Sequence, residues 1–386
     1  MSSKRERVSS VTGKKSFQVI LELGKDSTGK RKQEYRTFHE EKEADMFLHE
    51  KEIELYNGTY VGRNSISVKK VAQSWLGSIK ENRLKYNTIR GYTVNVEKHI
   101  VSNIGNIPIQ KLKSSDIKRL ITNMQKEGLA SATIKYAMLN LRQILDYAVE
   151  HHLLKNSPFV GIKIPANRKT KIQPYTVDEL RTLLQVSKGT PLEFILQIEV
   201  GTGLRIGEIL ALKWSDVDFE RSQISVNGTV VYKKGEGCVI DTPKSYSSFR
   251  TIPIHSSLMN TLKKLKSEES KRLATLSKKK CLDDITIIHN KKWGLRIPSK
   301  VSSDFSKLLE KNNLRHIRFH DLRKTHASIL ALNYGMSPYA IRDRLGHSRV
   351  STTIDCYISG TAKQQIDGLS MLAFDISNDV NEKTTA

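Results

Sequence analysis

The hydrophobic period of this sequence changes several times along the chain, and these changes limit the fold more than any other feature. Apolar residues alternate with others from Phe17 to Leu23, as in a β-strand. The spacing is helical throughout residues 65–163, and a period of two returns within residues 224–254 between further helical stretches. At 386 residues the chain exceeds the usual size of a single core. The sequence predicts a multidomain protein, mainly α-helical with small β-sheets.

The first 62 residues predict a small sheet followed by a helix. Residues 17–23 and 33–38 form a predicted hairpin around turn residues, and helical spacing follows at residues 44–55. Basic residues gather in the sheet and acidic residues in the helix, so the sheet is expected to face phosphate groups. The alternative is an edge hairpin whose lysines stay in solvent.

Residues 65–163 predict a bundle of four amphipathic helices. Apolar stripes run from Val68 to Ile79 and from Ile89 to Ile100, a third helix is one that Asp116 is placed to cap, and a fourth follows. Lysines and arginines lie between the stripes with few acidic neighbours. Such a bundle is suited to clamping a duplex, although any single lysine here is more typical of a solvated surface residue.

The charge balance indicates a polyanionic partner. The chain has 64 Lys and Arg against 40 Asp and Glu, a formal net charge of +24. Nucleic acid is favoured over an anionic membrane because no long basic amphipathic helix stands out, and no run of about 18 apolar residues occurs. The three cysteines form neither a disulfide framework nor a CxxC zinc pair. With no apolar leader, we expect a cytoplasmic protein that acts on DNA without a membrane partner.

Arg205 is the first residue in the second half of the chain whose position predicts an anionic partner. A basic connector at residues 164–171 precedes a Thr176-x-x-Glu179 capping box, where a new helical domain begins. Arg205 then stands between a Gly-Thr-Gly interruption and a strongly helical segment, among apolar residues. Burying it unpaired is costly, and Glu208 at i+3 is placed to orient it. A structural ion pair and a phosphate clamp are both open at this point.

Lys244 lies in a turn of the small sheet predicted over residues 224–254. An ammonium on such a turn can reach a ligand and donate a proton. On composition alone, however, a lysine in a turn is usually a solvated residue.

Two imidazoles, a guanidinium and a phenol fall within a few turns of chain further on. His320 and Arg323 lie at i and i+3 and share one helix face. His347 lies just beyond a helix that a glycine ends, and a short helix capped by residues 351–353 carries Tyr357. Guanidinium and imidazole donors can neutralise a pentacoordinate phosphorus that a phenol attacks. His316 and His320 are spaced like zinc ligands, but no third ligand follows at a familiar spacing, so no metal is expected.

These motifs, in this order, resemble the tyrosine recombinase (phage integrase) family. The resemblance is carried by Thr-Gly-Leu-Arg-x-x-Glu (202–208), Pro-Lys (243–244), Ser-x-Arg-Thr-Ile-Pro (248–253), His-x-x-Arg (320–323), Leu-Gly-His (345–347) and Tyr357. It implies an arm-type DNA-binding domain at 1–62 with a three-stranded sheet plus helix, and a helical core-site DNA-binding domain at 65–163. It further implies an α+β catalytic domain at 174–375 and a polar tail at 376–386.

The resemblance also implies a role for each matched position. The catalytic positions would be Arg205, Lys244, His320, Arg323, His347 and the nucleophile Tyr357, with Glu208 as an orienting residue. The arginines and histidines would bind the scissile phosphate, the lysine would protonate the leaving 5′ oxygen, and the tyrosine would form a 3′-phosphotyrosyl linkage. Because one ester replaces another, no cofactor is expected.

The implied function is site-specific integration and excision of a mobile element. The implied partners are double-stranded DNA at core and arm sites, three further protomers in a homotetramer on two duplexes, and accessory directionality and DNA-bending proteins. A type IB topoisomerase-like enzyme shares the phosphotyrosyl chemistry, and a catalytically silent DNA-binding protein is the non-enzyme alternative.

Overall fold

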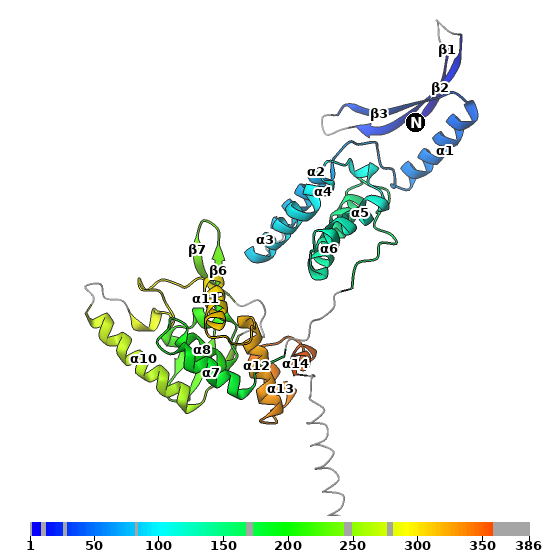
Figure 1. Cartoon of the computed structure of the whole chain (residues 1–386). Coiled ribbons are helices and arrows are strands. Elements are labelled where there is room, and N and C mark those ends of the chain that lie inside the picture. Colours follow the sequence, from blue (N-terminus) through cyan, green and yellow to red (C-terminus); the bar gives the residue numbers. More distant parts are fainter. Residues whose placement is uncertain are drawn as a thin grey trace, which may run out of the picture. The chain divides into compact units, whose positions relative to one another are not determined.

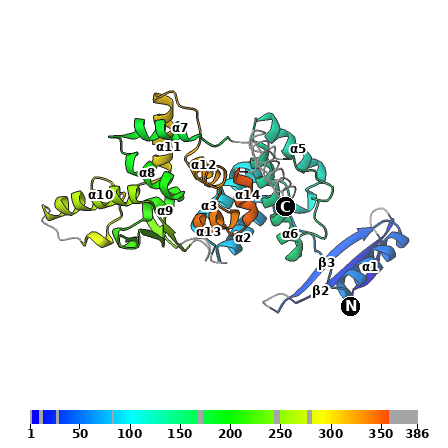
Figure 2. The same ribbon diagram turned by 90° about the horizontal axis from the view of Figure 1, so that it is seen from below.

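The computed structural model describes residues 2–8, 13–25, 29–81, 84–166, 173–242, 249–275 and 281–357, apart from the side chains of residues 355–357. The chain divides into two compact units, Met1–Lys169 and Thr170–Ala386. Figures 1 and 2 show the helices and strands of each unit. None of the described helices is both long and apolar enough to cross a lipid bilayer.

The first unit begins with an antiparallel three-stranded sheet in the order β1-β2-β3. Its strands are β1 (Ser3–Val8), β2 (Lys15–Lys25) and β3 (Arg31–Phe38), and helix α1 (Glu41–Tyr56) follows. The helix covers one face of the sheet, where Val19, Leu21 and Ala44 are buried together (Figure 2). The expected sheet-plus-helix fold is confirmed.

Strand β1 has no apolar alternation, so the hydrophobic pattern alone predicted only a hairpin. Its sequence is SKRERV, and it is held by backbone pairing with β2. Lys4 adds ion pairs to two carboxylates of α1, Glu41 at 3.0 Å and Asp45 at 2.5 Å. Backbone pairing and ion pairs thus position β1, whereas burial of apolar side chains does not.

Glu54 is the exception on the otherwise exposed acidic face of α1. It is buried and pairs with Lys51 and with Lys155, which follows the last helix of the bundle. Burial alone would raise the pKa of Glu54, but the hydrogen bonds from Lys155 and Lys51 outweigh it and lower the pKa. The sheet segment and the bundle are therefore joined by an ionised, buried carboxylate.

The predicted bundle is confirmed over residues 68–150, which are all described except 82 and 83. It consists of α2 (Val68–Glu81), α3 (Tyr86–Asn95), which continues through a π-helical segment (Val96–Val101) into α4 (Ser102–Ile104), then α5 (Ser114–Lys126) and α6 (Ser131–Glu150). The apolar stripes of these helices form one core. Asp116 was expected to precede its helix as the cap but lies inside the first turn, where it accepts a hydrogen bond from the Lys113 backbone at 3.0 Å.

The second unit contains α7 (Val177–Ser187), α8 (Glu193–Thr202), α9 (Ile206–Ala211), α10 (Ser256–Ala274), α11 (Pro298–Lys311), α12 (Phe319–Leu332), α13 (Pro338–Leu345) and α14 (Val350–Tyr357). Strands β4 (Val217–Asp218), β5 (Gln223–Val226) and β8 (Arg250–Pro253) form an antiparallel sheet, and β6 (Thr229–Lys233) pairs with β7 (Gly237–Asp241). Helices and sheet share one apolar core that includes Trp214 and Phe305. The α+β architecture expected for this half is confirmed.

Local signals placed the start of α7 correctly and the start of α14 incorrectly. The Thr176 and Glu179 capping box forms, with hydrogen bonds of 3.2 and 2.7 Å. Helix α14, however, begins at Val350, so residues 351–353 lie inside the helix and do not cap it. The lysine-rich helix α10 ends at Ala274, and residues 276–280 lie outside the described part. The predicted polar tail also lies outside it.

Candidate active site

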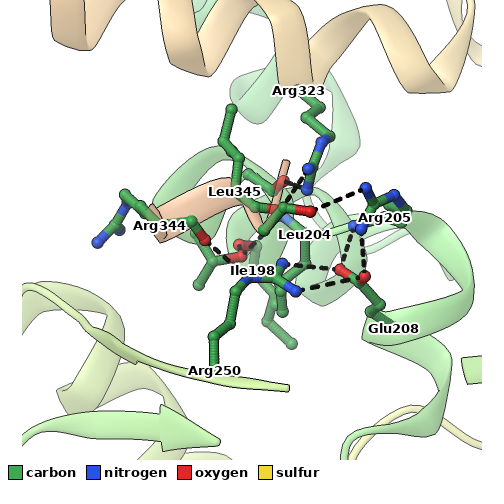
Figure 3. A network of polar contacts seen from close by, with 11 residues as sticks. Ile198, Leu204, Arg205, Glu208, Arg250, Arg323, Arg344 and Leu345 are labelled. Atoms are coloured by element: carbon green, nitrogen blue, oxygen red, sulfur yellow. Dashed lines mark hydrogen bonds and ion pairs between the residues drawn. The ribbon is translucent and has the colours of Figure 1, made fainter. Parts of the chain in front are cut away.

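Arg205 occupies the N-cap position of α9, immediately after the break that ends α8. Gly203 makes that break with a left-handed φ of 68°, and Arg205 itself has an extended backbone. Its guanidinium contacts Glu208 through Nη1–Oε1 at 2.7 Å and reaches the Gly346 carbonyl through Nη2 at 3.4 Å (Figure 3). The predicted Glu208 partner is therefore present, and the side chain remains 38% exposed toward solvent.

Glu208 is a buried carboxylate that serves two arginines. Its Oε2 accepts from the Arg205 backbone N–H at 3.0 Å, and Arg250 from strand β8 contacts both oxygens, at 3.4 and 2.9 Å. Burial alone would raise the pKa of Glu208, but the hydrogen bonds and charge of Arg250, with the charge of Arg205, lower the pKa to about 2. Glu208 thus stays ionised and fixes the direction of the Arg205 guanidinium.

Arg323 lies in α12 with its guanidinium almost fully buried. Nη1 donates to the Gly203 carbonyl at 2.8 Å, and Nη2 donates to the Leu345 carbonyl (Figure 3). Its Nε has no hydrogen-bond partner in the described part of the chain. Burial, followed by the charge of Arg205, lowers the pKa of Arg323 to about 9. Carbonyl dipoles orient this cation, but none of these contacts neutralises its charge.

His347 follows Gly346, which ends α13 with a φ of 66°. Its Nδ1 lies 2.9 Å from the hydroxyl of Thr353, a fully buried residue of α14. Burial and the charge of Arg323 lower the pKa of His347 to about 4, so the ring is neutral at pH 7. If the hydroxyl donates to Nδ1, the proton sits on Nε2, which is then a donor.

His320 lies one helical turn before Arg323 in α12, as its i, i+3 spacing predicted. The residue is exposed as a whole, yet partial desolvation of the ring and the charges of Arg323 and Arg205 lower its pKa. The same two cations influence both histidines. His320, His347 and the two arginines therefore act on one region of space.

Two predicted site residues lie wholly or partly outside the described part of the chain. Lys244 lies outside the described residues, in the segment between β7 and β8. Tyr357 is the last residue of α14, but its side chain also lies outside the described part. The structure therefore brings together Arg205, Glu208, Arg323 and His347 directly, with His320 beside them.

Arg344 and His326 form a polar support that the sequence did not reveal. Arg344 donates to the carbonyls of Pro253 and Gly201, each at 2.8 Å, and its Nε lies 3.1 Å from His326 Nε2. His326 Nδ1 donates to the Val200 carbonyl at 2.8 Å, which leaves Nε2 as the acceptor for Arg344. Helix α13 is thus fastened to α8, α12 and β8. The sequence offered only a weak local signal for this support, which was the position of His326 one helical turn after Arg323 on α12.

Glu199 is a second buried acid beneath the site, on α8. Neither of its oxygens has a hydrogen-bond partner in the described part of the chain. Burial raises the pKa of Glu199 well above its usual value, and the charge of Arg323 only partly opposes this. Burial therefore favours the neutral acid over the carboxylate at this position. Within the described residues there is no group of three or more His, Cys, Asp or Glu side chains placed to hold a metal.

The arrangement is suited to binding a tetrahedral anion. Arg205 and Arg323 approach one point from α9 and α12, and a neutral imidazole stands at the end of α13. Guanidinium groups bind phosphate oxygens with fixed planar geometry. Such donors stabilise negative charge that develops on the bound group.

Comparisons with known proteins agree with these features. The model of the phage integrase family matches residues 174–364, and that of the SAM-like N-terminal domain of phage integrases matches residues 67–125. The chain is 28% identical to a XerC-like tyrosine recombinase of Caldanaerobacter subterraneus subsp. tengcongensis, over 93% of this chain and 96% of the relative. It is 29% identical to the ICEBs1 integrase of Bacillus subtilis, over 76% and 79% respectively.

A solved structure shares the fold. The Tn1549 transposon integrase in complex with circular intermediate DNA superposes with a TM-score of 0.67 and 23% identity, covering 80% of this chain and all of that one.

Proposed function

This chain belongs to the phage integrase family, and from that premise we propose that it is a site-specific DNA recombinase that integrates and excises a mobile element. The observation that carries the proposal is the convergence of Arg205 and Arg323 on one point beside His347, with the Arg205 side chain still open to solvent. A phosphodiester is the anion that the sequence order of the motifs and the net charge of +24 both favour.

The reaction that we assign to the site is a transesterification. The Tyr357 phenol oxygen attacks the scissile phosphorus, the bond from phosphorus to the 5′ oxygen breaks, and a 3′-phosphotyrosyl linkage with a free 5′ hydroxyl results. Lys244 protonates the leaving oxygen, and His320 assists removal of the phenol proton. A phenol has a pKa of about 10, so forming the phenolate at pH 7 costs roughly 4 kcal/mol. The nearby cations offset this cost.

Arg205 and Arg323 bind the non-bridging oxygens in this proposal, and His347 donates a hydrogen bond from Nε2. Thr353 supports that donation because its hydroxyl occupies Nδ1 at 2.9 Å. The negative charge on these oxygens grows as the phosphorane forms, so the arginines bind the transition state more strongly than the ground state.

Double-stranded DNA is the partner that follows from this activity. We assign arm-site binding to the N-terminal domain at 1–62 and core-site binding to the helical domain at 65–163. The catalytic domain is assigned to residues 174–375. Exchange between two duplexes breaks four strands, and each protomer carries one nucleophile, so a homotetramer on two duplexes is the expected assembly. Accessory directionality and DNA-bending proteins are expected to modulate it.

Covalent capture of DNA tests the nucleophile. The full chain and its Tyr357→Phe variant are incubated with nicked, labelled duplexes tiled across the DNA that flanks the gene, and covalent adducts are separated in denaturing gels. We expect adducts with the parent chain only. Tyr339→Phe, on an exposed residue of α13, is the matched control and should still form them. Capture by Tyr357→Phe, or by neither protein, would contradict the proposal.

Two other functions predict different products. A type IB topoisomerase-like enzyme would relax supercoils without joining two sites, whereas recombination gives joint molecules between two defined sequences. A catalytically silent binding protein would bind the same duplexes and form no adduct. The occupied catalytic positions disfavour the silent binding protein, and relatives that are integrases and recombinases disfavour both alternatives.

A further inference from the structure

Arg250 lies in the Ser-x-Arg-Thr-Ile-Pro segment, which the proposed function leaves without a role. We propose that Arg250 is a positioning residue that fixes both Arg205 and the end of α13 for phosphate binding. The inference rests on the proposed function, because it concerns the same phosphate site.

The first contact of Arg250 is with Glu208. The two guanidinium nitrogens reach both carboxylate oxygens, and the side chains are only 6% and 4% exposed (Figure 3). Glu208 in turn holds Arg205 by its guanidinium and its backbone N–H. With Arg250 in place the carboxylate cannot turn away from Arg205. Removing Arg250 would leave Glu208 free to rotate, and Arg205 would follow it.

The second contact of Arg250 is with the last turn of α13. Its Nε donates to the Arg344 carbonyl at 2.8 Å. The next two carbonyls, of Leu345 and Gly346, accept from Arg323 and Arg205, and His347 follows directly. One side chain on β8 therefore fixes the backbone that orients two cations and a histidine.

The geometry requires a guanidinium. Nε and the two Nη atoms of Arg250 reach acceptors on α9 and α13 at once, which suits a planar fork and not a single ammonium. The same contacts direct these nitrogens at protein acceptors and away from solvent. Arg250 thus acts on the phosphate through Arg205 and α13, without touching it.

The test measures single-turnover cleavage of a nicked duplex that the parent chain captures. Arg250→Lys keeps the charge and loses the fork, and we expect cleavage to slow roughly 10- to 100-fold, the effect of a small misplacement of catalytic groups. Affinity for the duplex is expected to stay at the parental value. Arg221→Lys is the matched control, because Arg221 is 81% exposed on the turn between β4 and β5. It should cleave at the parental rate.

A second substrate separates positioning from a general loss of structure. A methylphosphonate at the scissile position removes one charged oxygen and so reduces the need for Arg205. The penalty of Arg250→Lys should then shrink, whereas a merely structural defect would slow both substrates equally. An equal penalty on both, or parental cleavage of the phosphodiester, would overturn the inference.

The single variant Glu208→Gln provides a test that does not depend on folding of an Arg250 variant, and the double variant extends it. It should slow cleavage of the phosphodiester more than that of the methylphosphonate, and Arg250→Lys added to it should cause little further loss. Fully additive losses would count against the inference. Tyr357→Phe is run in parallel, because retained cleavage there would refute the proposed function, whereas a parental rate in Arg250→Lys refutes only the role of Arg250.

Discussion

Gly203 connects the fold of the second unit to the candidate site through its backbone. It ends α8 with a φ of +68°, and its carbonyl accepts from Arg323 Nη1 at 2.8 Å. A Cβ at this position would lie 2.6 Å from Cδ2 of His326 and 2.8 Å from Cδ2 of Leu345. Gly203→Ala therefore strains the backbone and also forces two packed side chains to move.

The two effects have separate magnitudes. A left-handed backbone costs an L-residue about 1–2 kcal/mol. Overpacking at a tightly packed site costs a further 1–3 kcal/mol or so, which gives about 2–5 kcal/mol in total. Gly189 is the matched control, because it has a φ of +71° in the same unit and no atom of the described residues lies within 4 Å of the position that a Cβ would take. Gly189→Ala should lose the backbone contribution alone.

Thermal unfolding of the full chain and single-turnover cleavage measure the outcome. About 2–4 °C is expected per kcal/mol for a unit of this size. Gly203→Ala should unfold at a lower temperature than Gly189→Ala and should cleave slowly, since the carbonyl that orients Arg323 moves. Equal losses of stability in the two variants, with parental cleavage in both, would refute the reasoning.

Other perturbations give simpler tests. Burial lowers the pKa of His326 to about 4, so as the pH falls the unfolded chain binds this proton before the folded chain does. The free energy of unfolding of the second unit should therefore decrease from pH 6.5 to 4. His326→Gln should reduce the slope of that free energy against pH by up to about 1.4 kcal/mol per pH unit, as measured by denaturant titrations. Burial raises the pKa of Glu199, so its contribution is lost as pH rises, and Glu199→Gln should gain on the parent above pH 4.5 in the same titrations. Lys155→Ala should cost the first unit about 1 kcal/mol at pH 7 and less below pH 4.5, where Glu54 becomes protonated, as followed by thermal unfolding. A chelator should leave covalent capture unchanged, and strong inhibition would revive the zinc interpretation of His316 and His320.

Much of the site could be predicted because its signals are local. Gly203 and Gly346 end helices at left-handed positions, and this places Arg205 and His347 at helix termini. The i, i+3 spacing put His320 and Arg323 on one face of α12. The Arg205 to Glu208 pair is also a short-range contact, which helix geometry alone permits.

The remainder depends on contacts between residues far apart in the sequence. Arg250 meets partners 42 and 94 positions away, and Arg323 donates to a carbonyl 120 positions away. Such pairs impose no period on the sequence, so neither residue's partners could be found from hydrophobic patterning. Strand β1 was not predicted from the hydrophobic pattern for a related reason, because its pairing uses backbone groups that every residue carries.

Without a bound anion, the positive charges of the candidate site are only partly neutralised. Glu208 is ionised and forms ion pairs with Arg205 and Arg250, whereas Arg323 donates its hydrogen bonds to backbone carbonyls and forms no ion pair within the described residues. Arg323 remains protonated at neutral pH even with a pKa of about 9, so Arg205, Arg250 and Arg323 carry three positive charges against the one negative charge of Glu208. Under the proposed function a phosphodiester supplies one of the two missing negative charges. The phosphorane carries one charge more than the diester, so the same deficit that destabilises the free site favours the transition state.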